Sequence, residues 1–242
     1  MLNHLLRDIP QFFTYNNMVF LAGAAGNTLL LTALGCGIGA VMGFVLVYIR
    51  QSTGILLLPI RLLVIVYVEV FRRIPFLVIL FIVLFAVQAV NKTASLFAIA
   101  TIAICLLSTA FMSEIIRAGF ESIPRQQTEA AVGMNFSRWQ TLWNVVVPQS
   151  WRVILPPGVN YAVMFIKDSA LAGQMGVFEL TFAAKMFDGR GLTPILAFGS
   201  VLLCYFALSY PLSRIGAWLE VKLASSGDKR AQLLVRERLR PA

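Results

Sequence analysis

Charged residues are scarce in this chain. Only 13% of its 242 residues are charged, while 59% are hydrophobic, whereas an average soluble domain is about 45–50% apolar and about 25% charged. This apolar excess is larger than a core for a chain of this length requires. We therefore expect a lipid bilayer to be the solvent for much of the chain.

Residues that carry catalysis and metal binding are also scarce. His4 is the sole histidine and lies in a leading polar segment, so no Ser–His arrangement is expected. The three cysteines, Cys36, Cys105 and Cys204, lie in separate apolar runs without a short spacing, so metal and redox motifs are absent. No Gly-Lys pair occurs, which excludes a Walker A phosphate loop. We predict that the chain is not an enzyme, holds no metal and binds no cofactor itself.

An excess of positive charge remains, with a formal net charge of +9. The basic residues form no patch interleaved with aromatic residues, and several flank long apolar runs, so we predict no nucleic-acid partner.

The first 18 residues contain Arg7, Asp8 and Pro10 and lack a compact apolar region, so no cleavable signal peptide is predicted.

Long apolar runs, in contrast, are abundant. A membrane-spanning helix needs about 20 mostly apolar residues, and these runs predict an all-α polytopic membrane protein with about five transmembrane helices. The predicted transmembrane domain covers 20–223, between an extracytoplasmic segment over 1–19 and a basic cytoplasmic tail over 224–242. The predicted spans are 20–49, 55–90, 94–116, 152–177 and 191–219.

Two features leave alternatives open. Pro75 disfavours a continuous helix through residue 74, so 55–90 holds either an interfacial helix followed by a span or one kinked span. Gly35, Gly39 and Gly43 recur every four residues. They indicate either a face that lets another helix approach closely or simple tolerance of glycine in a membrane helix.

The distribution of basic residues predicts the orientation. Arginine and lysine are concentrated in the segments on the same side as residues 120–150, and such segments face the cytoplasm. We therefore expect the N-terminus outside and the C-terminus in the cytoplasm. The basic tail either contacts anionic lipid or a cytoplasmic partner, or is simply a solvated end.

One polar segment has a specific spacing. Glu129-Ala130-Ala131 is followed by three residues, Asn135, nine residues and then Val145-Val146-Val147-Pro148. This segment resembles the EAA loop of ABC-importer permeases, whose pattern is Glu-Ala-Ala, three residues, Gly, nine residues and Ile-x-Leu-Pro. Asn135 at the glycine position is a departure from that pattern.

The same segment predicts two short helices within a coupling loop over 120–150. Pro124 should end the helix that leaves the third span, and Glu129 should lie in the first turn of the next helix. Asn135 is expected to provide a left-handed cap, and Ser137 to cap the second helix at its N-terminus. Pro148 should end that second helix.

Other motifs are similar to the polar amino-acid uptake branch of this family. They are the segment from Tyr67 to Pro75, the segment from Ser113 to Gly119, and Lys167-Asp168-Ser169-Ala170-Leu171. The resemblance implies the ABC importer type I permease fold, with cytoplasmic coupling helices, in a bacterial inner membrane. It also implies a polar amino acid as substrate.

The resemblance further implies the partners. They are a second permease chain, identical or homologous, two ATPase subunits that hold ATP and Mg, a periplasmic solute-binding protein, and membrane lipid. For the segment 120–150, the alternative to a coupling loop is an ordinary amphipathic connector between spans. In that case Trp139 and Trp143 would face the membrane interface instead of a partner groove. The residues predicted to contact the ATPase are Glu129, Ala130, Ala131, Gly133, Asn135, Ser137, Arg138, Trp139, Trp143 and Pro148.

Ionisable residues inside the spans indicate a substrate path, because such residues are costly in a membrane and usually face a cavity. Glu114 or Asp168 is predicted to accept the substrate ammonium; the alternative is an ion-pair network between spans, with Lys167 extended to the interface. Lys167 and Asp168 are each expected to have their own partner, and 156–158 to break the fourth span. The substrate-path candidates are Ser108, Thr109, Met112, Glu114, Asn160, Met164, Lys167 and Asp168.

Three rival functions remain. An ion-driven secondary transporter would require inverted repeats, which the two halves do not show. A membrane enzyme would require a catalytic cluster. A purely structural scaffold would require neither inverted repeats nor a catalytic cluster. ATP-stimulated uptake separates the importer from all three.

Overall fold

The computed structural model of this chain describes residues 2–52 and 54–223. Over this part of the chain every regular element is a helix, so the all-α prediction is confirmed. The predicted basic tail, 224–242, lies outside the described residues. The elements are α1 (Leu2–Phe12), α2 (Tyr15–Arg50), η1 (Ile55–Leu57), α3 (Leu58–Phe71), α4 (Phe76–Val90), α5 (Leu96–Glu121), α6 (Arg125–Gly133), α7 (Arg138–Thr141), η2 (Leu142–Val146), α8 (Val147–Gln174), α9 (Leu180–Gly189) and α10 (Pro194–Leu223).

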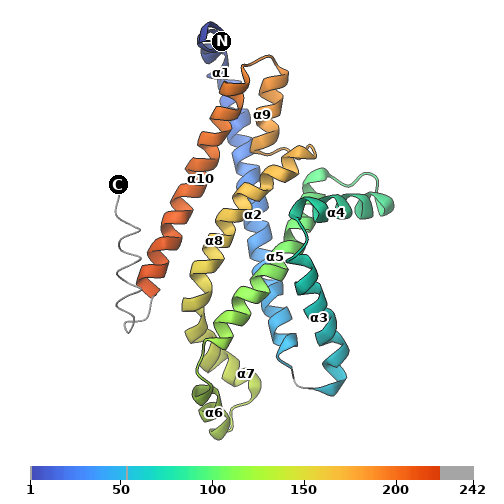
Figure 1. The fold of residues 1–242 in the computed structure, drawn as a ribbon, viewed down its shortest axis with the longest axis vertical. Coiled ribbons are helices and arrows are strands. Elements are labelled where there is room, and N and C mark those ends of the chain that lie inside the picture. The colour runs from blue at the N-terminus through green and yellow to red at the C-terminus, as the bar shows by residue number, and fades with distance from the viewer. Residues whose placement is uncertain (1, 53, 224–242) are drawn as a thin grey trace.

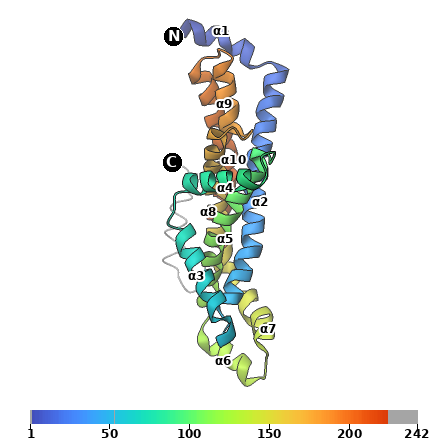
Figure 2. The same ribbon diagram turned by 90° about the vertical axis from the view of Figure 1, so that its right-hand side faces the viewer.

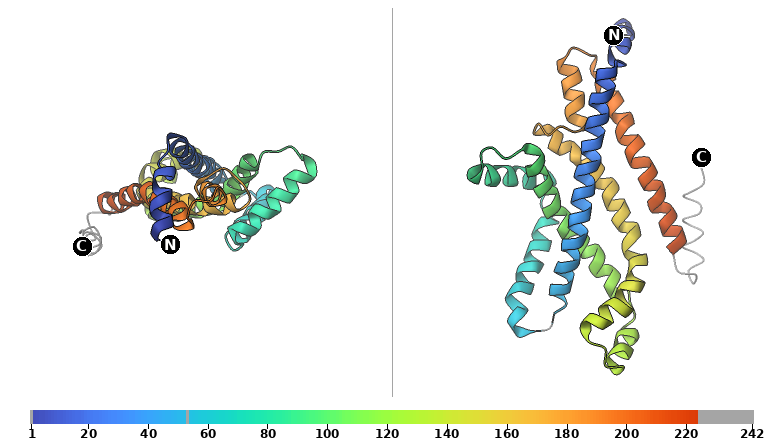
Figure 3. Two further views of the ribbon diagram at one scale, coloured as in Figure 1. Left: turned by 90° about the horizontal axis from the view of Figure 1, so that it is seen from above. Right: turned by 180° about the vertical axis from the view of Figure 1, so that it is seen from behind.

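Two long helices, α2 and α5, form the centre of the molecule. α2 runs along most of the length of the molecule, and α5 crosses beside it. α8 and α10 lie next to this pair (Figures 1 and 3). The largest buried cluster of apolar residues lies between α2, α4, α5 and α8 and includes Leu31, Leu80, Ile104 and Phe165. The core therefore lies between helices that are distant in sequence.

The stretch 55–90 folds as two helices, α3 and α4, that are bent by 117° at the break before Phe76. Pro75 has ψ 137°, an extended conformation, and this ends helical hydrogen bonding at the position that the proline predicts. α4 consequently lies across the long axis of the molecule (Figure 1). The break excludes one continuous straight helix over this stretch.

Length and composition identify α2, α5 and α10 as helices able to cross a membrane, and the bent pair α3–α4 as a fourth candidate span. The predicted fourth span, α8, is not among them. At 28 residues it is long enough, but Asn160, Lys167 and Asp168 reduce its apolar character. Five remains the predicted number of spans, with α8 the most polar of them.

The structure corrects the expected break in the fourth span. Pro156 and Pro157 lie inside α8, which continues through them to Gln174. Each proline removes the N–H that would bond the carbonyl four residues earlier, and those carbonyls belong to Arg152 and Val153, both exposed residues. Membrane helices tolerate proline where the carbonyls that lose their donor find other partners.

The two ends of the molecule differ in character. α6 and α7 lie at one end, and α1 and α9 lie at the other (Figure 2). α9, of ten residues, lies between the predicted spans 152–177 and 191–219, where the sequence analysis predicted no helix. The fold thus separates the coupling loop from the N-terminal helix by the length of the bundle.

Candidate coupling segment and substrate path

The first of the two predicted coupling helices, α6, begins at Arg125, directly after Pro124. Glu129 is therefore the fifth residue of the helix and not in its first turn, which corrects the sequence prediction. Pro124 remains extended, at ψ 134°, and its carbonyl accepts a hydrogen bond from the N–H of Gln127 at 3.0 Å. The proline thus starts the helix four residues before the Glu-Ala-Ala motif.

Asn135 ends this helix in the left-handed conformation, with φ 58°. Its N–H donates to the carbonyl of Val132 at 2.9 Å, and the N–H of Phe136 donates to that of Ala131 at 3.0 Å. These two bonds make a Schellman motif, which usually takes glycine at the left-handed position. The predicted left-handed cap is confirmed, so asparagine preserves the turn where the pattern has glycine.

Ser137 begins the second helix with a complete capping box. Its hydroxyl accepts from the N–H of Gln140 at 3.2 Å, and the N–H of Ser137 donates to the Gln140 side chain at 2.8 Å. The predicted N-cap is confirmed. Pro148, in contrast, does not end this helix: α7 passes through the π-helical segment η2 into α8, and Pro148 lies in the first turn of α8. Because Pro148 has no N–H, one intrahelical hydrogen bond is missing at this position, directly after the π-helical segment η2.

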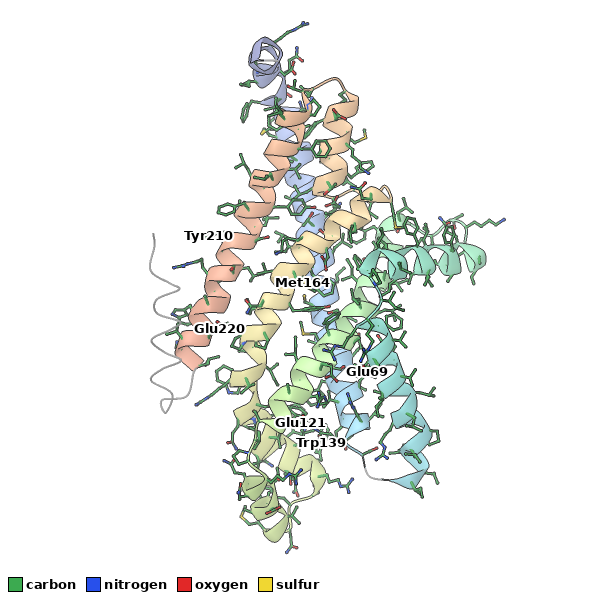
Figure 4. All side chains as sticks on the ribbon, in the orientation of Figure 1. Glu69, Glu121, Trp139, Met164, Tyr210 and Glu220 are labelled. Atoms are coloured by element: carbon green, nitrogen blue, oxygen red, sulfur yellow. The ribbon has the colours of Figure 1, made fainter. Side chains whose placement is uncertain are left out.

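The predicted ATPase-contact residues mostly face outward. Ala131 is fully buried, but Glu129 and Ala130 are exposed, and Val132 and Met134 beside them are more than 60% exposed. Gly133, Asn135, Ser137, Arg138, Trp139, Trp143 and Pro148 are not buried either. The two helices therefore present an accessible surface at one end of the bundle, where Figure 4 labels Trp139.

A cavity of about 700 Å³ separates α6 from the end of α2. Thr128, Glu129 and Val132 line one side, and Tyr48 and Leu57 line the other. α6 contacts η2 and α7, and the Gln149 side chain of α8 donates to that of Gln127 at 2.6 Å.

The packing of α2 on α5 decides between the two interpretations of the glycine repeat. A Cβ on Gly35 would overlap Ile104, one on Gly39 would overlap Ser108, and one on Gly43 would lie 2.7 Å from the backbone nitrogen of Ser113. Gly39 and Gly43 face the backbone of α5, and Gly35 faces the Ile104 side chain, so a side chain at any of the three positions would collide with α5. The face for close helix approach is therefore confirmed.

Glu114 on α5 is the centre of an ion-pair cluster. Its carboxylate lies 2.7 Å from Arg50 of α2, 3.2 Å from Arg72 at the end of α3 and 2.7 Å from Arg117 of α5. Arg117 also pairs with Glu121 at 2.6 Å. Glu114 is thus shared by three cations from three helices, which is the geometry of the ion-pair network alternative.

Lys167 and Asp168 are placed differently. Among residues 2–52 and 54–223 neither side chain has a hydrogen bond or salt bridge, although the two charges interact with each other. Lys167 is exposed and Asp168 is half-buried. The expectation that each has its own partner is not met within these residues, and Asp168 has no ion pair among them.

The other substrate-path candidates divide into two groups. Ser108, Thr109 and Met112 are buried in α5, and Met164 of α8, labelled in Figure 4, packs against the same cluster as Met112. Asn160 lies apart, with its amide donating to Glu220 of α10 at 3.1 Å. The structure thus places Met112 and Met164 on one core and Asn160 on the α8–α10 contact.

Tyr161 is a residue that the sequence analysis missed. Its ring stacks on Phe111 at 4.8 Å, and the guanidinium of Arg72 lies 5.7 Å from the centre of the Phe111 ring. Its hydroxyl is buried and lacks a hydrogen-bond partner among the described residues, and it interacts electrostatically with both Asp168 and Arg72. One sequence signal could have identified Tyr161. It follows Asn160 directly and lies two helical turns before Asp168, and both were substrate-path candidates.

Glu179 is a second missed residue, and it organises the opposite end of the bundle. Its carboxylate caps α9 by accepting from the N–H of Phe182 at 2.8 Å, and it accepts the hydroxyl of Tyr205 from α10. The side chain is fully buried, and burial raises the pKa of its carboxyl group. It packs on Gly173 so closely that a Cβ there would overlap it. The described residues contain no group of three metal-ligating side chains, at this place or elsewhere.

Comparison with known proteins places these features in context. The family model described as "Binding-protein-dependent transport system inner membrane component" matches residues 56–225. The L-cystine transport system permease protein of Bacillus subtilis is 34% identical to this chain over 204 residues, which cover 84% of this chain and 86% of that protein. The probable glutamine ABC transporter permease protein of the same organism is 36% identical over 163 residues, with coverages of 66% and 75%.

A solved structure supports the same relationship. The chain from a crystal structure of an amino acid ABC transporter with histidines superposes on this chain with a TM-score of 0.77 and 26% sequence identity. The match covers 86% of this chain and 95% of the other.

Proposed function

Since this chain belongs to the family of binding-protein-dependent transport system inner membrane components, we propose that it forms the translocation path of an ATP-driven importer for a polar amino acid. The membership confirms the resemblance inferred from the sequence motifs. The names of two relatives, which specify L-cystine and glutamine, support the substrate class.

The observation that carries this proposal is the exposed pair of helices α6 and α7. Their Glu-Ala-Ala spacing, the left-handed Asn135 and the capping box at Ser137 give the segment a defined shape. Exposed Val132 and Met134 beside exposed Glu129 suit a mixed apolar and polar protein partner. The partner that we propose is a cytoplasmic ATPase subunit, and two such subunits would hold the ATP and Mg.

The remaining partners follow from this role. A second permease chain, identical or homologous, would complete the path, and a periplasmic solute-binding protein would deliver the substrate. The chain would then cross a bacterial inner membrane with α6 and α7 in the cytoplasm. The fold supports this orientation because α1 and α9 lie at the opposite end from α6 and α7 (Figure 2).

We place the substrate path beside Asp168 and Tyr161. A zwitterionic amino acid requires an acceptor for its ammonium group and a donor for its carboxylate. Asp168, without an ion pair among the described residues, would supply the acceptor, and Arg72, whose guanidinium lies 5.7 Å from the Phe111 ring that stacks on Tyr161, would supply the cation. Glu114 is already shared by three arginines and therefore serves to hold α2, α3 and α5 together.

Transport in proteoliposomes tests the proposal. The chain would be reconstituted with its partner permease, ATPase and binding-protein subunits, and uptake of a panel of amino acids would be measured with and without ATP. We expect ATP-dependent uptake that Glu129→Ala lowers about tenfold, which corresponds to about 1.4 kcal/mol of lost coupling.

The matched control is Asp188→Ala. Asp188 is also an exposed helical carboxylate, but it lies on α9, at the other end of the bundle. Its replacement should leave ATP-dependent uptake unchanged. Accumulation driven by an ion gradient without ATP would contradict the importer and favour a secondary transporter.

A further inference from the structure

The two coupling helices are attached to the bundle very differently. α6 is separated from the end of α2 by the 700 Å³ cavity, and Ala131 is its one fully buried residue. The segment formed by α7 and η2, in contrast, packs directly on the bundle. Its Leu142 and Val146 lie in a buried apolar cluster with Val47 of α2 and with Ile116 and Phe120 of α5.

Aromatic rings cover this cluster. Phe44 and Tyr48 are one helical turn apart on α2, and Trp139 and Trp143 are one turn apart on the α7–η2 segment. The rings pair across the two helices, Phe44 with Trp143 and Tyr48 with Trp139, each with centroids 5.7 Å apart. Trp139 and Trp143 also contact each other at 5.5 Å.

The same helix that receives these rings is joined tightly to α5. Gly39 and Gly43 bring α2 to backbone distance from α5, and Arg50 of α2 reaches Glu114 of α5 at 2.7 Å. Phe44 adds a third connection, because its ring lies edge-on to Phe120 of α5 at 5.9 Å. Since packed helices deform little at such contacts, α2 and α5 should move as one body.

We propose that Phe44, Tyr48, Trp139 and Trp143 are positioning residues that transmit displacement of the coupling segment to the α2–α5 pair. This proposal rests on the proposed function and specifies which part of the permease the ATPase moves first. α5 carries Phe111, whose ring stacks on Tyr161 at 4.8 Å, so the displacement reaches the proposed substrate path through α5. α10 is outside this route, because its main contacts are with α1, α8 and α9.

The test compares uptake per ATP hydrolysed in the reconstituted complex. Trp143→Ala and Phe44→Ala should each lower this ratio roughly three- to tenfold, since each removes an aromatic pair. The double variant should lower it by less than the two single losses combined, because both single variants remove the contact between Phe44 and Trp143. Trp143→Phe keeps a ring against Phe44 and should retain most of the ratio.

The matched control is Trp151→Ala on α8. Trp151 is 42% exposed, close to the 45% of Trp143, and it makes no ring contact within the described residues. Its replacement should leave the ratio unchanged. Because the ratio is taken per ATP hydrolysed by assembled complexes, a variant that merely assembles poorly does not lower it.

The outcomes separate the two proposals. If the unsubstituted complex shows no ATP-dependent uptake, the proposed function fails. If it does, and Trp143→Ala retains the same uptake per ATP as Trp151→Ala, the transmission route through the rings is wrong while the importer stands. Additive losses in the double variant would likewise contradict the pairing of Phe44 with Trp143.

Discussion

The helices α5 and α10 are alike in sequence and unlike in structure. Both are long and apolar enough to cross a membrane. In an 18-residue apolar stretch of each helix, however, 56% is buried in α5 and only 11% in α10. α5 packs against α2, α3, α4 and α8, whereas α10 lies along one side of the bundle (Figure 3). Apolar composition therefore shows which segments enter the membrane but not which one becomes the centre.

The difference arises from shape more than from hydrophobicity. Lipid is as apolar as a leucine side chain, so helices associate in a membrane where their surfaces fit closely. Gly39 and Gly43 of α2 provide that fit to α5, while a methyl group placed on Gly199 of α10 would meet no other atom within 4 Å. Matched substitutions in the two helices test this contrast.

Truncating a phenylalanine should have the largest effect. Phe120→Ala on α5 removes a ring that is 7% exposed and should lower stability by about 3–5 kcal/mol. Phe206→Ala on α10 removes a ring that is 61% exposed and should cost under about 1 kcal/mol. Thermal unfolding of the purified permease in detergent measures both. Equal losses would contradict the difference in packing between α5 and α10.

Neutralising a glutamate should have the next largest effect. Glu114→Gln leaves three arginines around an uncharged group and should cost about 2–3 kcal/mol, less than for a fully buried pair because the arginines are partly exposed. Glu220→Gln keeps an acceptor for Asn160 and should be nearly neutral. The unfolding midpoint is the readout for both variants, and a neutral Glu114→Gln would mean that the cluster does not hold the helices together.

Adding one methyl group should have a smaller effect. In Gly119→Ala on α5 the new methyl overlaps the side chain of Ile154, which should cost about 1–2 kcal/mol. Gly199→Ala on α10 meets open space and should be neutral or slightly stabilising, since alanine favours a helix. The same thermal assay decides, and a stable Gly119→Ala would show that α8 moves aside easily.

Removing a hydroxyl should have the smallest effect. Ser108 on α5 and Ser209 on α10 both have buried hydroxyls without a hydrogen-bond partner among the described residues. Neither replacement by alanine breaks a hydrogen bond, so each should change stability by less than about 0.5 kcal/mol. Uptake should fall only in Ser108→Ala, because Ser108 is a substrate-path candidate. Equal uptake by both variants would remove Ser108 from the path.

The coupling segment shows how far local sequence reaches. Asn135 and Ser137 were predicted as caps and are caps, because their hydrogen bonds connect residues that are close in sequence. Pro148 and Pro156 were predicted to interrupt helices and do not. A proline stops a helix only where the lost hydrogen bond has no replacement, and its surroundings decide that.

The candidate site was less predictable than the segment. The sequence identified Glu114 and Asp168 as ionisable residues inside spans, but not that three arginines surround the first and that Tyr161 accompanies the second. Glu179 was missed because it follows a predicted span and precedes a helix too short to be recognised. These assignments need contacts between separate helices.

By itself, the sequence determined the all-α membrane class, the caps at Asn135 and Ser137 in the segment of α6 and α7, and the break at Pro75. Each depends on composition or on neighbours within a few residues. Only the tertiary structure decided that α5 is central, that Arg50 meets Glu114 across 64 positions, and that Phe44 and Tyr48 receive the two tryptophans. The physical reason is that such contacts depend on how closely the helices approach and on which faces they turn to each other, and one helix alone fixes neither.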